Sequence, residues 1–277
     1  MQTLTAENLN ADNFIFKLKT VDGKHQIRYV DKTTGYPAIA KSPWFISSFG
    51  LSSYAKSKGT NDTITDWAID FKAACYQTLD LKSLPPFDYE KNKNEIELFF
   101  KFLKDSEKKS VDFAHENSTK FFKKEIKKEI IEEAYVTKFI KKSDKKDNDG
   151  NPYPDFITTK IMKNIKTGSP DIVIEDLDGN SIPIENWEDI ESKLSEIVVK
   201  GSTARIIIQL RPYLVNNKFG FSIKLCAIQL DNKKKNNMNS IFSFKENPVE
   251  LVKKITSMDE ETHDSENEEG SEVEVEE

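Results

Sequence analysis

The sequence has few of the residues from which most catalytic and metal-binding sites are built. It contains three histidines and two cysteines, and His25, His115 and His263 are far apart in the chain. Cys75 and Cys226 have no second cysteine or histidine at the spacing of metal ligands, so we expect two free, buried thiols. Glycine-rich phosphate loops and the GxSxG nucleophile motif are also missing. We therefore expect a protein that is not an enzyme and that holds neither a metal nor a cofactor.

Long apolar runs are missing as well. No stretch approaches the ~18 consecutive apolar residues that a membrane-spanning helix needs. Residues 1–14 are polar and acidic, which is unlike a signal peptide or a basic transit peptide. The expected protein is therefore intracellular and has no membrane partner.

Arginine is scarce, and the acidic residues are unevenly distributed. The chain has Arg28, Arg205 and Arg211 against 38 lysines. Residues 259–277 contain eleven acidic residues and no Lys or Arg. Because the whole chain has a net charge of −6, removing those eleven negative charges leaves +5 on residues 1–258. We expect a basic folded domain followed by a disordered acidic tail.

The clearest periodic pattern is a pair of strands predicted over residues 200–230. Apolar and polar residues alternate in both strands, which places them on opposite faces of a sheet. The Asn-Asn pair at 216 and 217 predicts the connecting turn, because asparagine tolerates positive φ. Two of the three arginines fall on the polar face, so function is expected there; the face consists of Arg205, Gln209, Arg211, Ser222 and Lys224.

The rest of the chain predicts further strands, interrupted once by helices. A helical insertion is expected over about residues 61–134, and its first helix would carry Ile64, Trp67, Phe71 and Cys75 at three- and four-residue spacing. One helix is expected through residues 122–130. Strands are expected at 14–19, 26–30, 41–54, 135–141 and 155–165, with a hairpin over 171–184, a helix from 186 and a last short helix over 248–255. This order predicts a mainly β, α+β protein, an OB-fold-like antiparallel barrel with a helical insertion.

Two segments rich in acidic residues are interpreted as non-functional. Residues 147–150, DNDG, resemble part of a calcium-binding loop, but Phe156 stands where such a loop has its bidentate glutamate. Residues 171–191 carry eight acids and no base, and this face should repel nucleic acid. Any anion-binding surface is expected elsewhere.

The remaining features favour binding of single-stranded nucleic acid, which needs cations for phosphates and flat side chains for bases. Arginine offers both a hydrogen-bonding fork and a stacking plane. Alternatives stay open: the arginines could be ordinary exposed sheet residues, the aromatics at 44, 45 and 49 could be core, and the tail could serve solubility. The candidate residues are Arg28, Lys41, Trp44, Phe45, Tyr54, Lys200, Arg205, Arg211, Tyr213, Lys218, Phe219 and Lys224.

Two blocks of the sequence resemble a known family. The segment KGSTARIIIQLRPYLVNNKFGFSIKLCAIQL, residues 200–230, resembles the closing hairpin of viral single-stranded DNA-binding proteins. These are the OB-fold, acidic-tailed proteins of short-tailed coliphages and of large eukaryotic DNA viruses. SPWFISSFGLSSY, residues 42–54, resembles the aromatic strand of the large-virus branch. The phage tail ends in an aromatic residue, whereas this chain ends Glu276-Glu277. The motif positions are Lys200, Arg205, Arg211, Tyr213, Lys218 and Phe219.

The resemblance implies sequence-independent binding of single-stranded DNA in viral DNA replication, recombination and repair. A polyanionic tail tethered to a cationic surface is itself expected to compete with nucleic acid for that surface. The resemblance implies that the tail recruits a viral DNA polymerase and a helicase-primase, and that the protein forms homo-oligomers. The implied location is a viral factory in the host cytoplasm or the nucleus, or the virion. Two alternatives are a virion-structural or protein-interaction module that uses its acidic tail, and an RNA-binding protein.

Overall fold

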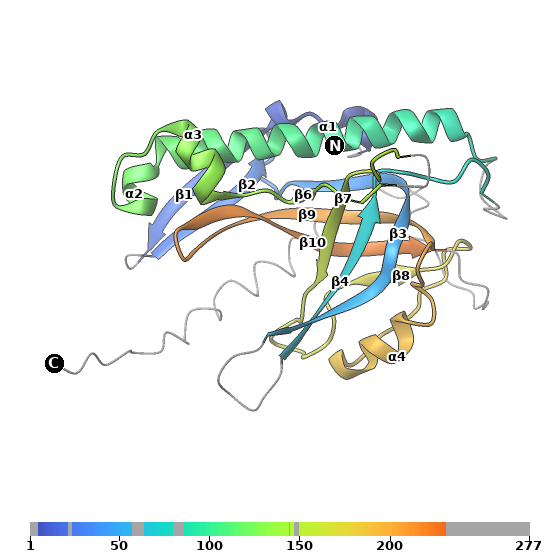
Figure 1. Ribbon diagram of the computed structural model, residues 1–277. Coiled ribbons are helices and arrows are strands. Elements are labelled where there is room, and N and C mark those ends of the chain that lie inside the picture. Colours follow the sequence, from blue (N-terminus) through green and yellow to red (C-terminus); the bar gives the residue numbers. More distant parts are fainter. Residues whose placement is uncertain are drawn as a thin grey trace.

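A computed structural model describes most of the chain up to the end of the last predicted strand (Figure 1). The described ranges are 5–21, 24–56, 64–79, 86–143, 145–146 and 150–230, without the side chains of 54–56 and 64–65. The acidic tail, the predicted helix at 248–255 and the DNDG loop, apart from Gly150, lie outside the described residues.

Five strands form a partly closed barrel. Neighbouring strands are antiparallel from β10 through β9, β3 and β4 to β7. A parallel contact between Lys224 of β10 and Lys160 of β7 brings the two ends of this order together. The predicted OB-like α+β class is confirmed. The strands are β3 (Ile39–Lys56), β4 (Ile64–Lys72), β7 (Phe156–Ile161), β9 (Thr203–Val215) and β10 (Lys218–Leu230).

The β9–β10 hairpin forms as the alternation predicts. Asn216 and Asn217 both have positive φ, 50° and 57°, as a tight two-residue turn of matching twist requires. The register pairs Leu210 with Ile223 and Ile208 with Leu225, so the apolar residues share one face. A register shift between Leu225 and Ala227 follows, and beyond it Ile228 and Leu230 again face the apolar interior.

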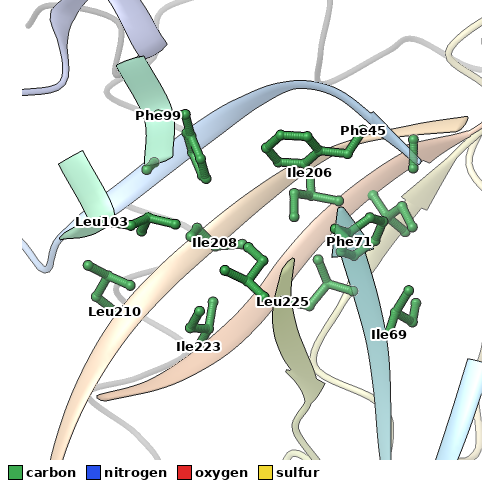
Figure 2. Close-up of a cluster of buried hydrophobic side chains, with 14 of the residues drawn as sticks. Phe45, Ile69, Phe71, Phe99, Leu103, Ile206, Ile208, Leu210, Ile223 and Leu225 are labelled. Carbon is green, nitrogen blue, oxygen red and sulfur yellow. The ribbon is translucent and has the colours of Figure 1, made fainter. Parts of the chain in front are cut away.

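Helix α1 (Tyr89–Glu116) covers the apolar interior of the barrel (Figure 1). It begins at Asp88, whose side chain accepts a hydrogen bond of 2.9 Å from the Lys91 backbone N–H. Phe99 and Leu103 of this helix are fully buried and point toward the strands. Figure 2 shows this contact, in which Phe99 and Leu103 face Phe45, Ile206, Ile208 and Leu210.

The predicted helix at the start of the insertion is wrong, because residues 64–72 form strand β4. The positions 64, 67, 68 and 71 fit helical spacing, but 67, 69 and 71 also alternate. The structure follows the second pattern: Trp67, Ile69 and Phe71 are all buried in the core. Pairing of β4 with both β3 and β7 decides between the two.

The single helix predicted through residues 122–130 is broken. Lys123, with φ of 61°, ends α2 (Ser118–Phe122), and α3 (Lys128–Ile130) and a π-helix (Ile131–Tyr135) follow. The strand predicted at 135–141 is two short strands, β5 (Val136–Thr137) and β6 (Ile140–Lys141). The Glu107 carboxylate of α1 accepts the backbone N–H groups of Phe139 and Ile140 at 2.7 and 2.9 Å.

A separate two-stranded sheet packs beside the tip of the β9–β10 hairpin. It consists of β1 (Phe14–Val21) and β2 (Lys24–Asp31), as predicted. The Phe16 ring lies 4.5 Å from the ring of Phe113 on α1 and 5.5 Å from that of Phe221 on β10. Two 3-10 helices, Ala6–Asn8 and Ala11–Asn13, precede β1.

The hairpin predicted over 171–184 is not regular. β8 (Val173–Glu175) runs parallel to β10, and only an isolated bridge joins Glu175 to Ser181. A 3-10 helix (Trp187–Asp189) leads into α4 (Ile190–Leu194). Within the described ranges, no helix has the length and apolar character to cross a membrane.

Candidate nucleic-acid interface

The outward positions of the five barrel strands form one surface, which we call the barrel surface. Its centre is fixed by the register: Lys224 of β10 lies opposite Gln209 of β9 and beside Lys160 of β7, which in turn lies opposite Ala68 of β4. The barrel surface consists of Arg205, Gln209, Arg211, Tyr213, Ser222, Lys224, Phe156, Thr158, Lys160, Asp70 and Lys72, together with Lys41 and Trp44 on β3. The hairpin face predicted from the sequence is part of it.

Arg205 is held in place on this surface. It lies directly opposite Trp44, and its guanidinium carbon is 5.0 Å from the indole centroid. It donates a hydrogen bond of 2.5 Å to Gln229 Oε1. Burial lowers the pKa of Arg205 to about 10, and the negative charges of Glu175 and Glu95 partly offset this. The side chain therefore stays cationic at neutral pH.

Lys41 is the neighbouring cation. Burial, and after it the positive charge of Arg205, lower its pKa to about 7, although Glu95 and Glu175 partly offset both effects. The lysine is therefore poised between its charged and neutral forms near neutral pH. An anion beside Lys41 and Arg205 would favour the charged form.

Trp44 is not a platform for a base. Its side chain is 7% exposed and packs against Leu79, Phe87 and Leu177, so its free face is covered. On its other edge β3 pairs with β4 only from Ile46 onward, so the backbone of Trp44 lies before that pairing. The side chain of Asn92 on α1 pairs with this backbone instead of a strand. Asn92 Oδ1 accepts a hydrogen bond of 2.9 Å from the backbone N–H of Trp44, and the Asn92 amide donates one of 3.1 Å to the backbone carbonyl of Trp44. Trp44 supports Arg205.

Phe45 and Phe219 are also misplaced in the prediction, because both are fully buried. Phe45 follows outward-facing Trp44, so strand alternation turns it inward, where its ring centroid lies 5.4 Å from that of Phe99. The Phe219 ring lies 5.7 Å from those of Phe16 and Phe121. Both are core residues and cannot stack on a base.

Lys224 is a fourth residue for which the prediction is corrected. Its ammonium lies 2.6 Å from Asp171 Oδ2, and both side chains are almost completely buried. The Asp171 carboxylate neutralises the charge of Lys224 inside the protein. Lys224 therefore has a structural role, although it occupies an outward strand position.

The acidic segment 171–191 does not form the wholly exposed face expected from the sequence. Asp171, Glu175 and Asp176 are buried. Asp176 accepts hydrogen bonds of 2.8 Å from the backbone and the side chain of Asn180, which closes the Leu177–Asn180 turn. The other acids of the segment are at least partly exposed.

The other predicted residues differ in exposure. Arg211 and Tyr213 are half-buried on the outward face of β9. The Tyr213 hydroxyl lies 3.1 Å from where a Cβ on Gly220 would be, so its ring crosses the strand at that glycine. Lys218 is exposed and donates to the Ala134 carbonyl. Lys200 and Arg28 are exposed too, on the turn before β9 and on β2, and the Tyr54 side chain lies outside the described residues.

Sequence reasoning missed two pairs of lysine and aromatic ring, which add Tyr153 and Lys141 to the barrel surface. Lys72 Nζ lies 5.4 Å from the ring centroid of Tyr153, which is 42% exposed. Lys141 Nζ lies 5.8 Å from the centroid of Phe156 and donates a 2.7 Å hydrogen bond to Thr158 Oγ1. The alternation of Phe156, Thr158 and Lys160 was a usable signal, but the segment before it reads as a plain loop.

Phe49, left open between core and stacking platform, is 63% exposed. It stands at the register shift in β3, where Gly50 has a φ of 78°. A Cβ on Gly50 would lie 2.5 Å from the Val198 carbonyl oxygen, so the backbone of the bulge lies directly against the turn before β9. The inward position at the bulge is occupied by backbone, and the ring of Phe49 faces solvent.

In the part of the chain that the structure describes, no group of three or more His, Cys, Asp or Glu side chains could hold a metal ion. Cys75 and Cys226 are free thiols, the first half-buried and the second buried. Burial raises the pKa of the Cys75 thiol, which disfavours the reactive thiolate.

Comparison with known proteins gives weak structural similarity only. No protein-family model matches the chain, and no curated protein matches it. The single-stranded DNA-binding protein from bacteriophage Enc34, in complex with ssDNA, has 10% sequence identity and a TM-score of 0.38; the match covers 82% of this chain and 98% of that one. The single-stranded DNA-binding protein gp2.5 encoded by bacteriophage T7 has 13% identity and a TM-score of 0.34, with 76% and 97% covered. Similarity at this level carries no argument, so the function is argued from the chain's own residues.

Proposed function

We propose that this chain binds single-stranded DNA without sequence preference. The observation that carries the proposal is the barrel surface, where lysines lie against accessible aromatic rings on the outward side of β4 and β7. Single-stranded nucleic acid is held by this combination, since cations follow the phosphates and bases stack on rings. OB-type barrels bind oligonucleotides on the outward face of their strands and on the adjoining loops.

The roles follow from position and exposure. Tyr153 and Phe156 offer faces for bases, while Lys72, Lys141 and Lys160 offer charge to the backbone. Arg211 and Tyr213 continue the same combination on β9.

We propose binding without sequence preference because the amide side chains that could read base edges are not accessible. Gln209 and Gln229 could read base edges by hydrogen bonding, but both are buried. The accessible groups recognise phosphates and ring faces, which every nucleotide has.

We further propose that the protein acts in viral DNA replication, recombination and repair. The resemblance of residues 200–230 and 42–54 to viral single-stranded DNA-binding proteins supports this role. In this proposal the tail, with its eleven acids in residues 259–277, competes with DNA for the barrel surface and recruits the polymerase and helicase-primase. Self-association belongs to the same proposal.

A salt-dependent titration of a labelled mixed-sequence oligonucleotide tests the binding proposal. The logarithm of the affinity should fall against the logarithm of salt concentration by about 0.7 for each phosphate neutralised. The double variant Lys72→Ala, Tyr153→Ala should bind at least roughly tenfold more weakly, because a stacked base contributes about 1–3 kcal/mol. Lys193→Gln on α4, whose lysine pairs with Asp189 at 3.5 Å, is the matched control and should bind normally.

No binding at low salt, by either the full chain or the chain without 259–277, would show the proposal to be wrong. Competition between DNA and RNA oligonucleotides of one sequence separates DNA binding from RNA binding. A preference for RNA would show that the ligand is RNA and not DNA, and the proposed binding surface would remain the same.

A further inference from the structure

The outward face of the β1–β2 sheet is strongly cationic. The register pairs Lys17 with Arg28, Lys19 with Gln26 and Val21 with Lys24, and these pairs lie on the same face. The opposite face, which includes Phe14 and Phe16, packs against α1 and β10. We call the first face the cationic face; its charged residues are Lys17, Lys19, Lys24 and Arg28, all exposed, and none of its other residues that the structure describes on β1 and β2 is acidic.

The arrangement on this face is electrostatically unfavourable by itself. Lys17 and Arg28 are directly opposite across the two strands, and like charges in that position destabilise a sheet. The ion pairs of the described residues include neither of these two residues nor Lys19. On α1, by contrast, Lys101 and Lys104 lie 3.1 and 3.2 Å from Asp105 and Asp155. An external anion bound near Lys17 and Arg28 would be attracted to both cations, and this attraction would offset the repulsion between them.

The sheet that carries the cationic face packs against the hairpin that carries part of the barrel surface. Its sheet packs through Phe16 and Tyr29 against Phe221 of β10, at ring distances of 5.5 and 5.1 Å. Phe221 is the strand partner of Pro212, which stands between Arg211 and Tyr213. Figure 1 shows β1 and β2 beside the rounded end of the β9–β10 hairpin, under the C-terminal half of α1. A strand that leaves the barrel surface at this tip would pass around the end of the hairpin to reach the cationic face.

We propose that the cationic face binds the phosphodiester backbone of nucleic acid, as an extension of the barrel surface. This inference rests on the proposed function. Side chains at every second residue of a strand are spaced by roughly 6.6–6.8 Å, so Lys17 and Lys19 form a row that follows an extended backbone. No aromatic side chain is on this face, so it contributes charge without base stacking.

The triple variant Lys17→Gln, Lys19→Gln, Arg28→Gln tests the inference with two oligonucleotides. One has about 8 nucleotides and fits within a single barrel, and the other has about 30. Loss of three phosphate contacts should lower the salt slope for the long oligonucleotide by about 2 and its affinity by tenfold or more at 0.1 M salt. Affinity for the short oligonucleotide should stay unchanged.

The control carries the same change of charge elsewhere. Lys101→Gln, Lys104→Gln, Lys108→Gln on α1 removes three lysines that pair with acids and should leave the salt slope for the long oligonucleotide unchanged. The variant Lys17→Arg, Lys19→Arg keeps the charge and should bind like wild type, which separates loss of charge from misfolding.

The outcomes distinguish this inference from the function on which it rests. If wild type binds and the triple variant has the same slope on the long oligonucleotide, the inference is wrong and the barrel surface stands. If wild type binds neither oligonucleotide, the proposed function itself fails. The same comparison in a chain without 259–277 decides between DNA and the acidic tail as occupant: an effect that vanishes there assigns the face to the tail and overturns the inference.

Discussion

Trp44 and Arg205 face each other across β3 and β9, with the guanidinium carbon 5.0 Å from the centre of the indole. The tryptophan is buried beneath Leu177 and Phe87 and fixes the arginine from one side. Gln229 fixes it from the other by accepting a hydrogen bond at 2.5 Å. A cation held in this way loses little side-chain freedom on meeting a phosphate, which favours binding.

The first prediction separates Trp44 from Phe49, two of the three aromatics of β3 whose role was open in the sequence. Trp44→Ala should lower the free energy of unfolding by about 3–5 kcal/mol, because it empties a packed site. Phe49→Ala should change it by at most about 0.5 kcal/mol, because that ring is exposed. Urea unfolding of both variants measures the difference, and equal losses would contradict the structure.

How far the sequence predicts this fold depends on how local each signal is. The β9–β10 hairpin is predictable because alternation and an Asn-Asn turn act within its own residues. β4 is misassigned because its apolar spacing fits two structures, and pairing with distant β7 decides. Trp44 and Phe45 follow one another, and which of them faces outward depends on the register shift just before Trp44.

The candidate site shows the same division. The polar face of β9 is predictable by period, and Arg211 and Tyr213 lie there. The burial of Lys224 cannot be predicted from the sequence, because its partner Asp171 comes from a segment that no local pattern connects to β10. The rings over which Lys72 and Lys141 lie are likewise set by tertiary contacts.

The second prediction concerns the buried pair of Lys224 and Asp171. Asp171→Ala should lower the free energy of unfolding by about 3–5 kcal/mol, because it leaves a buried charge without its partner. Lys224→Met should cost a similar amount, and the double variant Lys224→Met, Asp171→Leu should recover most of the loss. Chemical denaturation of the four proteins gives the coupling energy.

Lys224→Met also tests the assignment of this residue as structural. At a temperature where the variant is folded, its salt slope for DNA binding should equal that of wild type. A slope lower by about 0.7 would instead identify Lys224 as a phosphate contact.

The third prediction concerns Lys41 and the pH dependence of stability. Its pKa in the folded protein is about 7 against an ordinary value of 10.5. Between these values the unfolded chain binds the proton that the folded chain has released, so this residue should make stability rise with pH from about 7 to 10.5. Below pH 7 both states are protonated and the contribution is flat. Lys41→Met should remove the rise, as measured by urea unfolding at several pH values.

DNA affinity should respond to the same residue in the opposite direction. A phosphate near Lys41 and Arg205 favours the protonated lysine, so affinity should fall as pH rises through about 7. The negative charges of Glu95 and Glu175, which also act on Lys41 and Arg205, favour the protonated lysine and do not reverse this direction. Lys41→Arg should bind with little dependence on pH between 6 and 9. An unchanged pH profile in that variant would remove Lys41 from the interface.

The fourth prediction concerns the acidic residues 259–277. Removing them takes away eleven negative charges and leaves a body of +5, so affinity for single-stranded DNA should rise. The gain should be greatest at low salt and should shrink as salt screens the competition, because the Debye length falls from about 30 Å at 0.01 M to 10 Å at 0.1 M. Titrations of the full and shortened chains at both salt concentrations measure it. A tail of the same length with its acids replaced by Gln and Asn is the control and should behave like the deletion. Equal affinities of the full and shortened chains at low salt would show that the tail does not compete for the DNA surface.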